Sequence, residues 1–253
     1  MLVVLPIIRL DTAARCLNSI TRENSAAGFT REEMLLVDNT ESGSVPGAFP
    51  GFRVHRDPGG HNIGVARAWN VGIREVLNSK LAYVVFLSAS VEFGPELHTT
   101  WKGQMEEFWG SHVIEGWGHS WHLIAFHRRV FETVGLFDEN FYPAYFEAID
   151  FGYRMRICGQ TPDNPGDMIY NPEIGLEQDF KRVWVNAISW GAGQHIDMAD
   201  MPAAPLLKYY RDKWGGDKGE EQWTLPWNGK PLDYFPEKSI PDLAREYGLN
   251  RWW

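Results

Sequence analysis

The sequence predicts an α/β fold with a mostly parallel, mixed sheet and helices on both of its faces. Short, continuous apolar runs alternate along the chain with segments of helical periodicity, which is the pattern of successive strand and helix units. Polar side chains follow the ends of several of these runs. Because the carboxyl ends of parallel strands lie at one edge of a sheet, we expect ligands at that edge.

The first two strand and helix units open the chain. Leu2–Leu5 is a buried type of strand, and Pro6 and then a helix over Thr12–Ile20 follow it, with inward positions at Ala13, Cys16, Leu17 and Ile20. The next strand is the run MLLV, which ends in Asp38 and Asn39 before a segment rich in turn residues. The sequence therefore places a carboxylate at the carboxyl end of a strand.

The middle of the chain continues the alternation. A short strand over Phe52–His55 precedes a loop and a helix over Val65–Leu77. The run LAYVVFL, Leu81–Leu87, is the most strand-like segment of the chain, and Ser88 to Ser90 follow its end. Before residue 135 we also expect a helix over Glu96–Phe108, a strand over Leu123–His127 and then a short helix.

The stretch from Gly135 to Gly159 gathers carboxylates, aromatic rings and arginines. A helix over Tyr145–Ile157 would place Glu147, Asp150 and Arg154 on one face, because these residues are three and four positions apart. Alone, the pattern is typical of an amphipathic surface helix, whose exposed ion pair would contribute about 0.3 to 0.5 kcal/mol. Taken by itself, the stretch is either such a helix or a functional site.

Beyond Cys158 the pattern of elements weakens. Met168–Tyr170 is a short strand candidate, and from about Pro202 the composition shifts toward Trp, Tyr, Pro and Gly. The aromatic residues of this last segment need a surface on which they can be buried, so it is not a flexible linker. We expect a main domain over residues 1–180 and an aromatic-rich C-terminal extension over residues 181–253 that packs on it.

Composition and charge exclude several classes of protein. The net charge of -9 argues against a broad nucleic-acid footprint, which requires clustered Lys and Arg. The 12 Trp suit stacking on sugars or bases, and they equally suit the filling of a core. Two distant cysteines indicate neither a disulfide framework nor a zinc site. The N-terminal apolar run lacks the features of a signal peptide, so we expect a cytoplasmic protein without a stable membrane anchor.

Several motifs, taken in order, carry a family resemblance. NIGVARAWNVG (Asn62 to Gly72), VVLPIIR near the start, LLVDNTESG around Asp38, and FDENFYPAYFEAIDFGYRMRICG all occur in the order and spacing of one family. KYYRDKWGG, from Lys208, matches a further segment near the end of many members. Together they resemble inverting family 2 glycosyltransferases, which have the Rossmann-like GT-A fold. The resemblance covers residues 1 to about 180 and one point of the extension.

The resemblance implies a nucleoside-diphosphate-sugar donor, with a UDP-sugar favoured. Asp38 would take hydrogen bonds from the base or ribose, Gly64 would let the backbone approach the phosphates, and Arg67 would bind them. Asn62 and Asn70 would hold the loop, or they are ordinary capping residues. The complete donor-binding set is Pro6, Arg9, Asp38, Asn39, Asn62, Gly64, Arg67, Asn70, Ser88 and Ser90.

The resemblance also implies a general base that deprotonates the acceptor hydroxyl. Glu147 and Asp150 are the candidate catalytic residues, and Arg154 with Asp150 would hold the helix or the acceptor. His119, Trp121 and His122 lie in the segment that lines the acceptor pocket in this family. Either histidine is a further candidate for the base or an ordinary loop residue.

Three positions depart from the family pattern. Ala148 stands where the usual base is an Asp, Ser88-Ala89-Ser90 replaces the metal-binding Asp element, and Glu177-Gln178 replaces a metal-ligating His. Without these ligands the sequence speaks against a requirement for Mg²⁺ or Mn²⁺, and we assign no metal ligand. His195 remains either a phosphate contact or late ligand, or a structural histidine.

Two functions follow from the sequence. The first is transfer of a sugar, with inversion and without metal, to a hydroxyl acceptor such as a glycan, a protein or a modified nucleobase. Its stabilising contacts with the departing diphosphate would come from Arg9, Arg67, Ser88 and Ser90. The alternative is a non-catalytic GT-A relative that binds a nucleotide, a glycan or a protein. No pattern in the sequence indicates an oligomeric state.

Overall fold

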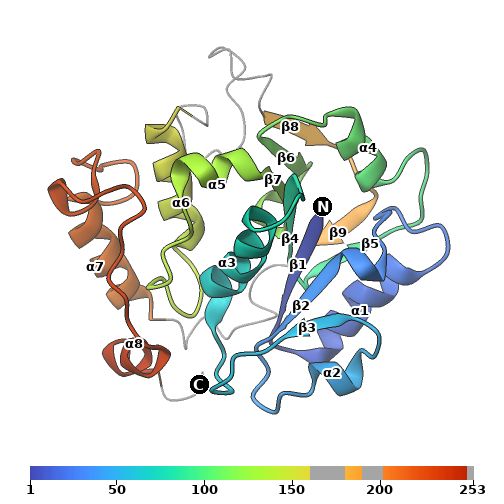
Figure 1. Cartoon of the computed structure of the whole chain (residues 1–253), viewed down its shortest axis with the longest axis horizontal. Coiled ribbons are helices and arrows are strands. Elements are labelled where there is room, and N and C mark those ends of the chain that lie inside the picture. Colours follow the sequence, from blue (N-terminus) through green and yellow to red (C-terminus); the bar gives the residue numbers. More distant parts are fainter. Residues whose placement is uncertain (160–179, 190–201, 250–253) are drawn as a thin grey trace.

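Figure 1 shows the computed structural model of the chain, which describes residues 1–159, 180–189 and 202–249. Within these residues a seven-stranded sheet has the strand order β3-β2-β1-β4-β7-β6-β8. Only β7 runs antiparallel to its neighbours in this sheet. The strands are β1 Leu2–Ile7, β2 Met34–Asp38, β3 Arg53–His55, β4 Tyr83–Leu87, β6 Val113–Gly116, β7 Leu123–His127 and β8 Phe180–Val183. The predicted mixed, mostly parallel sheet is confirmed.

Helices cover both faces of the sheet, as predicted. Figure 1 shows α3, α5 and α6 on one side and α1, α2 and α4 on the other. A separate pair of antiparallel strands, β5 Val91–Phe93 and β9 Ala187–Ser189, lies beside α1. The helices are α1 Leu10–Thr21, α2 Val45–Ala48, α3 Gly64–Leu77, α4 Trp101–Glu107, α5 Arg128–Val134 and α6 Glu147–Ile157, with 3-10 turns at Arg31–Glu33 and Ser120–His122.

The strands bury both of their faces, which explains why they are continuous apolar runs. In β1, Val4 packs with the α3 side of the core, whereas Val3 and Leu5 pack with the α1 side. In β4, Phe86 faces the first layer and Val85 the second. Because the side chains of a strand alternate between faces, a strand covered on both sides must be apolar at every position.

The C-terminal part of the chain packs against the α3 side. It contains α7 Ala203–Trp214, a 3-10 turn at Pro226–Asn228 and α8 Ile240–Glu246. Trp214 lies edge-on to Tyr153 of α6, with ring centroids 4.6 Å apart. Tyr209 and Leu243 belong to the same apolar cluster as Phe151 of α6. Tyr209 and Trp214 are therefore core residues, whereas Tyr234 is 39% exposed.

Some sequence expectations need correction. The helix expected from Glu96 begins at Trp101, because Thr100 caps it: the Thr100 hydroxyl oxygen accepts a hydrogen bond from the Gly103 N–H at 3.0 Å. The strands β5, β6 and β9 were not predicted, and β8 lies at the start of the expected extension. The strand candidate Met168–Tyr170, Glu177-Gln178 and His195 lie outside the described residues. None of the described helices is long and apolar enough to cross a bilayer.

Candidate active site

A cavity of about 330 Å³ opens at the edge of the sheet where β1 and β4 end. Its walls come from these strand ends, from α3, from the 3-10 turn before β7 and from the start of α6. A volume of this size and a mainly apolar lining with a few convergent polar groups are typical of a small-molecule site. The cavity thus occupies the sheet edge at which the sequence predicts ligand binding.

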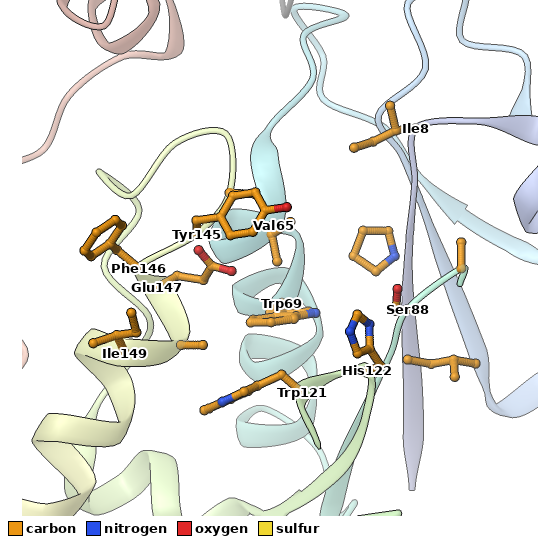
Figure 2. A pocket seen from close by; sticks show the side chains of 15 residues that line it. Ile8, Val65, Trp69, Ser88, Trp121, His122, Tyr145, Phe146, Glu147 and Ile149 are labelled. Carbon is orange, nitrogen blue, oxygen red and sulfur yellow. The ribbon is translucent and has the colours of Figure 1, made fainter. Parts of the chain in front are cut away.

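Several predicted site residues meet in this cavity although they are far apart in the chain. Figure 2 shows Glu147 on one side and Ser88 and His122 on the other, with the indole rings of Trp69 and Trp121 between them. The predicted residues that line the cavity are Pro6, Ser88, Trp121, His122 and Glu147. The structure therefore brings together candidates from the donor side, the acceptor side and the catalytic helix.

Trp69 is a cavity residue that the sequence analysis did not select. Its indole is stacked on Phe86 at a centroid distance of 4.7 Å, and it lies 6.0 Å from the indole of Trp121 at an interplanar angle of 20°. Trp69 lies inside the NIGVARAWNVG motif, but its position in the helical pattern is typical of a core residue. The other lining residues not selected from the sequence include Ile8, Val65, Tyr145 and Phe146.

Glu147 is the first residue of α6 and the principal titratable group of the cavity. Its side chain is buried, and its Oε2 atom has no hydrogen-bond partner among the described residues. Burial raises the pKa of this carboxyl group to about 8, because an apolar surrounding disfavours the charged form. Once ionised, a carboxylate with this pKa is a stronger base than an ordinary glutamate, and a useful fraction of it is ionised near pH 8.

The turn before Glu147 has an unusual backbone. Tyr145 and Phe146 have φ values of 73° and 65°, a left-handed backbone conformation that residues other than glycine rarely adopt. Such residues are strained by roughly 1 to 3 kcal/mol each and occur where surrounding contacts hold them. The turn holds Tyr145 at the cavity beside Glu147 (Figure 2).

Contacts with α3 hold this turn in place. The Tyr142 hydroxyl donates to the backbone oxygen of Asn62 at 2.9 Å, and the Val65 N–H donates to the backbone oxygen of Pro143 at 2.8 Å. A Cβ atom on Gly64 would lie 2.7 Å from that Pro143 oxygen, so this close approach requires glycine. Gly64 and Asn62 thus join the two walls of the cavity.

Asp150, the second candidate catalytic residue, lies in a closed ionic network instead of the cavity. It has no exposed surface, and it is paired with Arg154 at 3.0 Å and with Lys213 of α7 at 2.7 Å. The Trp214 indole N–H donates to the same Asp150 oxygen, Oδ1, that Lys213 contacts, at 2.9 Å. Burial by itself would raise the pKa of Asp150, but the charges of Lys213 and Arg154 lower it. These contacts fasten α6 to α7.

Ser88 and His122 line the wall opposite Glu147, and the buried Ser90 behind them links the two. The two hydroxyl oxygens are 2.8 Å apart, and the Ser90 hydroxyl lies 3.2 Å from Nδ1 of His122. Burial lowers the pKa of His122, so its ring is neutral at neutral pH in the empty cavity. The hydroxyl and imidazole groups of this wall can donate hydrogen bonds to an anion.

This wall does not fit the divalent metal that the family resemblance implies. Mg²⁺ and Mn²⁺ prefer carboxylate oxygens, whereas the wall presents hydroxyl groups and one imidazole. Across residues 1–159, 180–189 and 202–249, no group of three or more His, Cys, Asp or Glu side chains could hold a metal ion.

The predicted donor residues at the end of β2 hold loops together. Asp38 is buried, accepts hydrogen bonds from the Thr40 N–H and hydroxyl at 3.0 and 2.6 Å, and lies 3.3 Å from the Arg56 guanidinium. Asn39 accepts from the Ile63 N–H at 3.0 Å. In this structure their polar atoms face protein groups, so they shape the loops beside the cavity.

The remaining predicted residues lie around the cavity without lining it. Arg9 is half exposed and paired with Asp11 at 2.7 Å. Arg67 lies 3.3 Å from Glu139 and donates to the backbone oxygen of Lys238 at 2.5 Å. Asn70 is fully buried and exchanges hydrogen bonds of 2.9 Å with the Phe137 backbone. His119 is also buried, and burial, followed by the charge of His122, lowers its pKa.

The chain matches no family model. A galactofuranosyl glycosyltransferase of Leishmania donovani is 32% identical to it over 124 residues, which are 44% of this chain and 28% of that protein. The match thus spans well under half the length of this curated relative.

Solved structures give weaker likenesses. TarS of S. aureus has a TM-score of 0.44 and 12% identity, over 62% of this chain and 33% of that chain. The mannosyltransferase PcManGT of Pyrobaculum calidifontis, solved with GDP-Man and Mn²⁺, has a TM-score of 0.40 and 14% identity, over 60% of this chain and 51% of that chain. The sequence relative is a glycosyltransferase, the class of enzyme that the motifs predict.

Proposed function

We propose that this protein is a glycosyltransferase that moves a sugar from a nucleoside-diphosphate-sugar, with a UDP-sugar favoured, to a hydroxyl acceptor with inversion. The observation that carries the proposal is Glu147: a buried carboxyl group with an unpartnered oxygen and a pKa near 8, facing a cavity at the sheet edge. The glycosyltransferase relative and the ordered motifs support the same reaction class.

Glu147 serves as the general base. The acceptor hydroxyl oxygen attacks the anomeric carbon of the donor while its proton passes to the Glu147 carboxylate. The bond between that carbon and the diphosphate oxygen breaks, and its electron pair leaves with the diphosphate. Attack from the side opposite the leaving group inverts the configuration at carbon. Glu147 and the Ser88–His122 wall lie on opposite sides of the cavity, as this reaction requires (Figure 2).

The Ser88–His122 wall stabilises the departing diphosphate without a metal ion. The hydroxyl group of Ser88 donates a hydrogen bond to developing negative charge, and Ser90 positions Ser88 and His122 for this role. A bound diphosphate raises the pKa of the neighbouring imidazole, so the protonated ring of His122 offsets part of that charge. The indoles of Trp69 and Trp121, between the walls, provide flat apolar surfaces for a sugar ring. Asp150 lies outside the cavity and acts as a positioning residue that fixes α6.

The test is a screen of UDP- and GDP-sugars for donor hydrolysis and transfer, read by mass spectrometry. We expect turnover with a UDP-sugar that persists in EDTA and falls about 100-fold or more in Glu147→Gln. Glu132→Gln, which changes a half-exposed glutamate on α5, is the matched control and keeps full activity. Undiminished turnover in Glu147→Gln, or activity that EDTA abolishes and Mn²⁺ restores, would contradict the mechanism.

A non-catalytic binding protein is the alternative function. Ala148 lines the cavity at a position where the family resemblance implies a carboxylate, and Ser90 stands at another such position, which favours loss of catalysis with retention of the site. Calorimetry separates the two functions. A nucleotide-sugar that binds with ordinary affinity but shows neither hydrolysis nor transfer to any acceptor would support the binding protein.

A further inference from the structure

Two strongly exposed tryptophans lie next to each other at the end of the sheet. Trp117 follows β6 and Trp184 follows β8, and their exposed fractions are 64% and 48%. Large exposed apolar side chains that lie next to each other mark contact sites, whereas single ones are ordinary.

The backbone places the two residues side by side. β6 and β8 are parallel, and Gly116 is paired with Val183. The ladder continues for one more hydrogen bond, because the Trp117 N–H donates to the Val183 oxygen at 2.8 Å. Trp117 and Trp184 are therefore the next partners in register on strands that are about 4.8 Å apart. Two indoles at this spacing can contact neighbouring units of one ligand.

This pair lies on the same edge of the sheet as the cavity. β4, β6 and β8 run in one direction, so their carboxyl ends share an edge. In the sheet order, β6 is two strands and β8 three strands away from β4, or about 10 and 14 Å.

A short, fixed segment joins the pair to the cavity wall. The His119 N–H donates to the Gly116 oxygen, and the His122 N–H donates to the His119 oxygen, both at 2.9 Å. Trp117 begins this segment, and Trp121 and His122 at its end line the cavity. The exposed indoles thus continue the surface that leads into the proposed active site.

The size and chemistry of this surface favour a carbohydrate. An indole face packs against the C–H groups of a sugar ring, whereas the net charge of -9 disfavours a nucleic acid. Two tryptophans bury roughly 300 to 500 Å² together, far below the 1,200 Å² or more of a stable protein interface.

We propose that Trp117 and Trp184 form a platform for the distal rings of an oligosaccharide acceptor, whose terminal sugar enters the cavity. This inference rests on the proposed function, because it deepens the identity of the acceptor. It excludes a monosaccharide as the full acceptor and predicts that affinity rises with the number of linked sugars until the platform is occupied.

The test measures binding of neutral hexasaccharides and disaccharides built from glucose, galactose or mannose by calorimetry. We expect one hexasaccharide series to bind, and Trp117→Ala/Trp184→Ala to lose about tenfold or more of that affinity while disaccharide binding stays unchanged. Trp117→Phe keeps most of the affinity. Trp109→Ala is the matched control, because Trp109 is 52% exposed but lies against Tyr83, at the beginning of β4 and thus at the opposite edge.

Several outcomes overturn the platform. These are no binding of any hexasaccharide, an equal loss in Trp109→Ala, or a concentration-dependent dimer that Trp117→Ala abolishes in sedimentation experiments. Nucleotide-sugar binding and hydrolysis are measured on the same proteins. If donor turnover is intact and no hexasaccharide binds, the platform fails while the proposed function stands; if no donor is bound or turned over, the proposed function fails.

Discussion

Glu147 and Asp150 lie one turn apart on α6 and are both buried, yet their surroundings are opposite. Glu147 faces an apolar cavity with one unpartnered oxygen, and burial raises its pKa to about 8. Burial would also raise the pKa of Asp150, but Lys213 and Arg154 lower it. Burial alone therefore does not decide the role of a carboxyl group. The unpaired group is available to accept a proton, and the paired group holds helices together.

The largest expected effect comes from Asp150→Asn. The network around Asp150 joins two carboxylates, Asp138 and Asp150, to the cations Lys213 and Arg154, so this change leaves an uncompensated buried positive charge. Removing one partner of a buried ion pair destabilises a protein by about 3 to 5 kcal/mol. Urea denaturation, with the free energy of unfolding as the readout, measures this loss.

A matched control is Asp11→Asn, which removes the carboxylate of the exposed pair with Arg9. An exposed pair contributes at most about 1 kcal/mol, so this variant stays close to the parent protein. If both substitutions lower the free energy of unfolding equally, the buried network does not have the structural role that we assign to it.

The second prediction concerns the effect of pH on stability. The pKa of Glu147 is raised from 4.5 to about 8 on folding, so between these values the folded state holds a proton that the unfolded state has released. The free energy of unfolding therefore falls by a few kcal/mol as pH rises from about 4.5 to about 8. Glu147→Gln removes this component and makes the protein more stable than the parent at pH 8. A parent and variant with identical pH profiles would show that the Glu147 carboxyl is not perturbed.

Transfer activity should have the opposite dependence on pH. The base must be ionised to accept the acceptor proton, so the turnover rate rises with pH toward about 8. At higher pH the rate falls again, because His122 loses the proton that offsets the charge of the diphosphate. The rate of transfer at saturating donor, measured from pH 6 to pH 9, tests this. A rate that is already constant at pH 6 would mean that an ordinary carboxylate, or a group other than Glu147, acts as the base.

The sequence predicts most of the fold because the strands that matter are buried on both faces. β1 and β4 are continuous apolar runs, and β2 is apolar up to Asp38 at its end, which is a local signal. β6 was missed because it has only Val113 and Ile114 before Glu115, whose charge is paired with Arg182 on β8. That pairing joins residues distant in the chain and leaves no local pattern.

The candidate site was predictable only in part, for the same reason. The strand pattern placed Ser88 at the carboxyl edge of the sheet, and the family resemblance assigned Trp121 to the acceptor side and Glu147 to catalysis. The cavity contains all three. The spacing of Glu147 and Asp150 on one helix could not separate their roles. Their difference depends on Lys213, which reaches Asp150 from the C-terminal part of the chain. Only the folded structure shows which carboxylate is paired.

The smallest effect tests the strained turn that places Glu147. Tyr145 has a φ of 73°, a backbone conformation that is unfavourable for alanine but not for glycine. Tyr145→Gly should therefore be more stable than Tyr145→Ala by about 1 kcal/mol, although both variants lose the same ring. Lys208, inside α7, gives the opposite order, since alanine exceeds glycine there by roughly 0.5 to 1 kcal/mol. If alanine is also the more stable residue at position 145, surrounding contacts do not hold the turn in a left-handed conformation, and Glu147 reaches the cavity by another route.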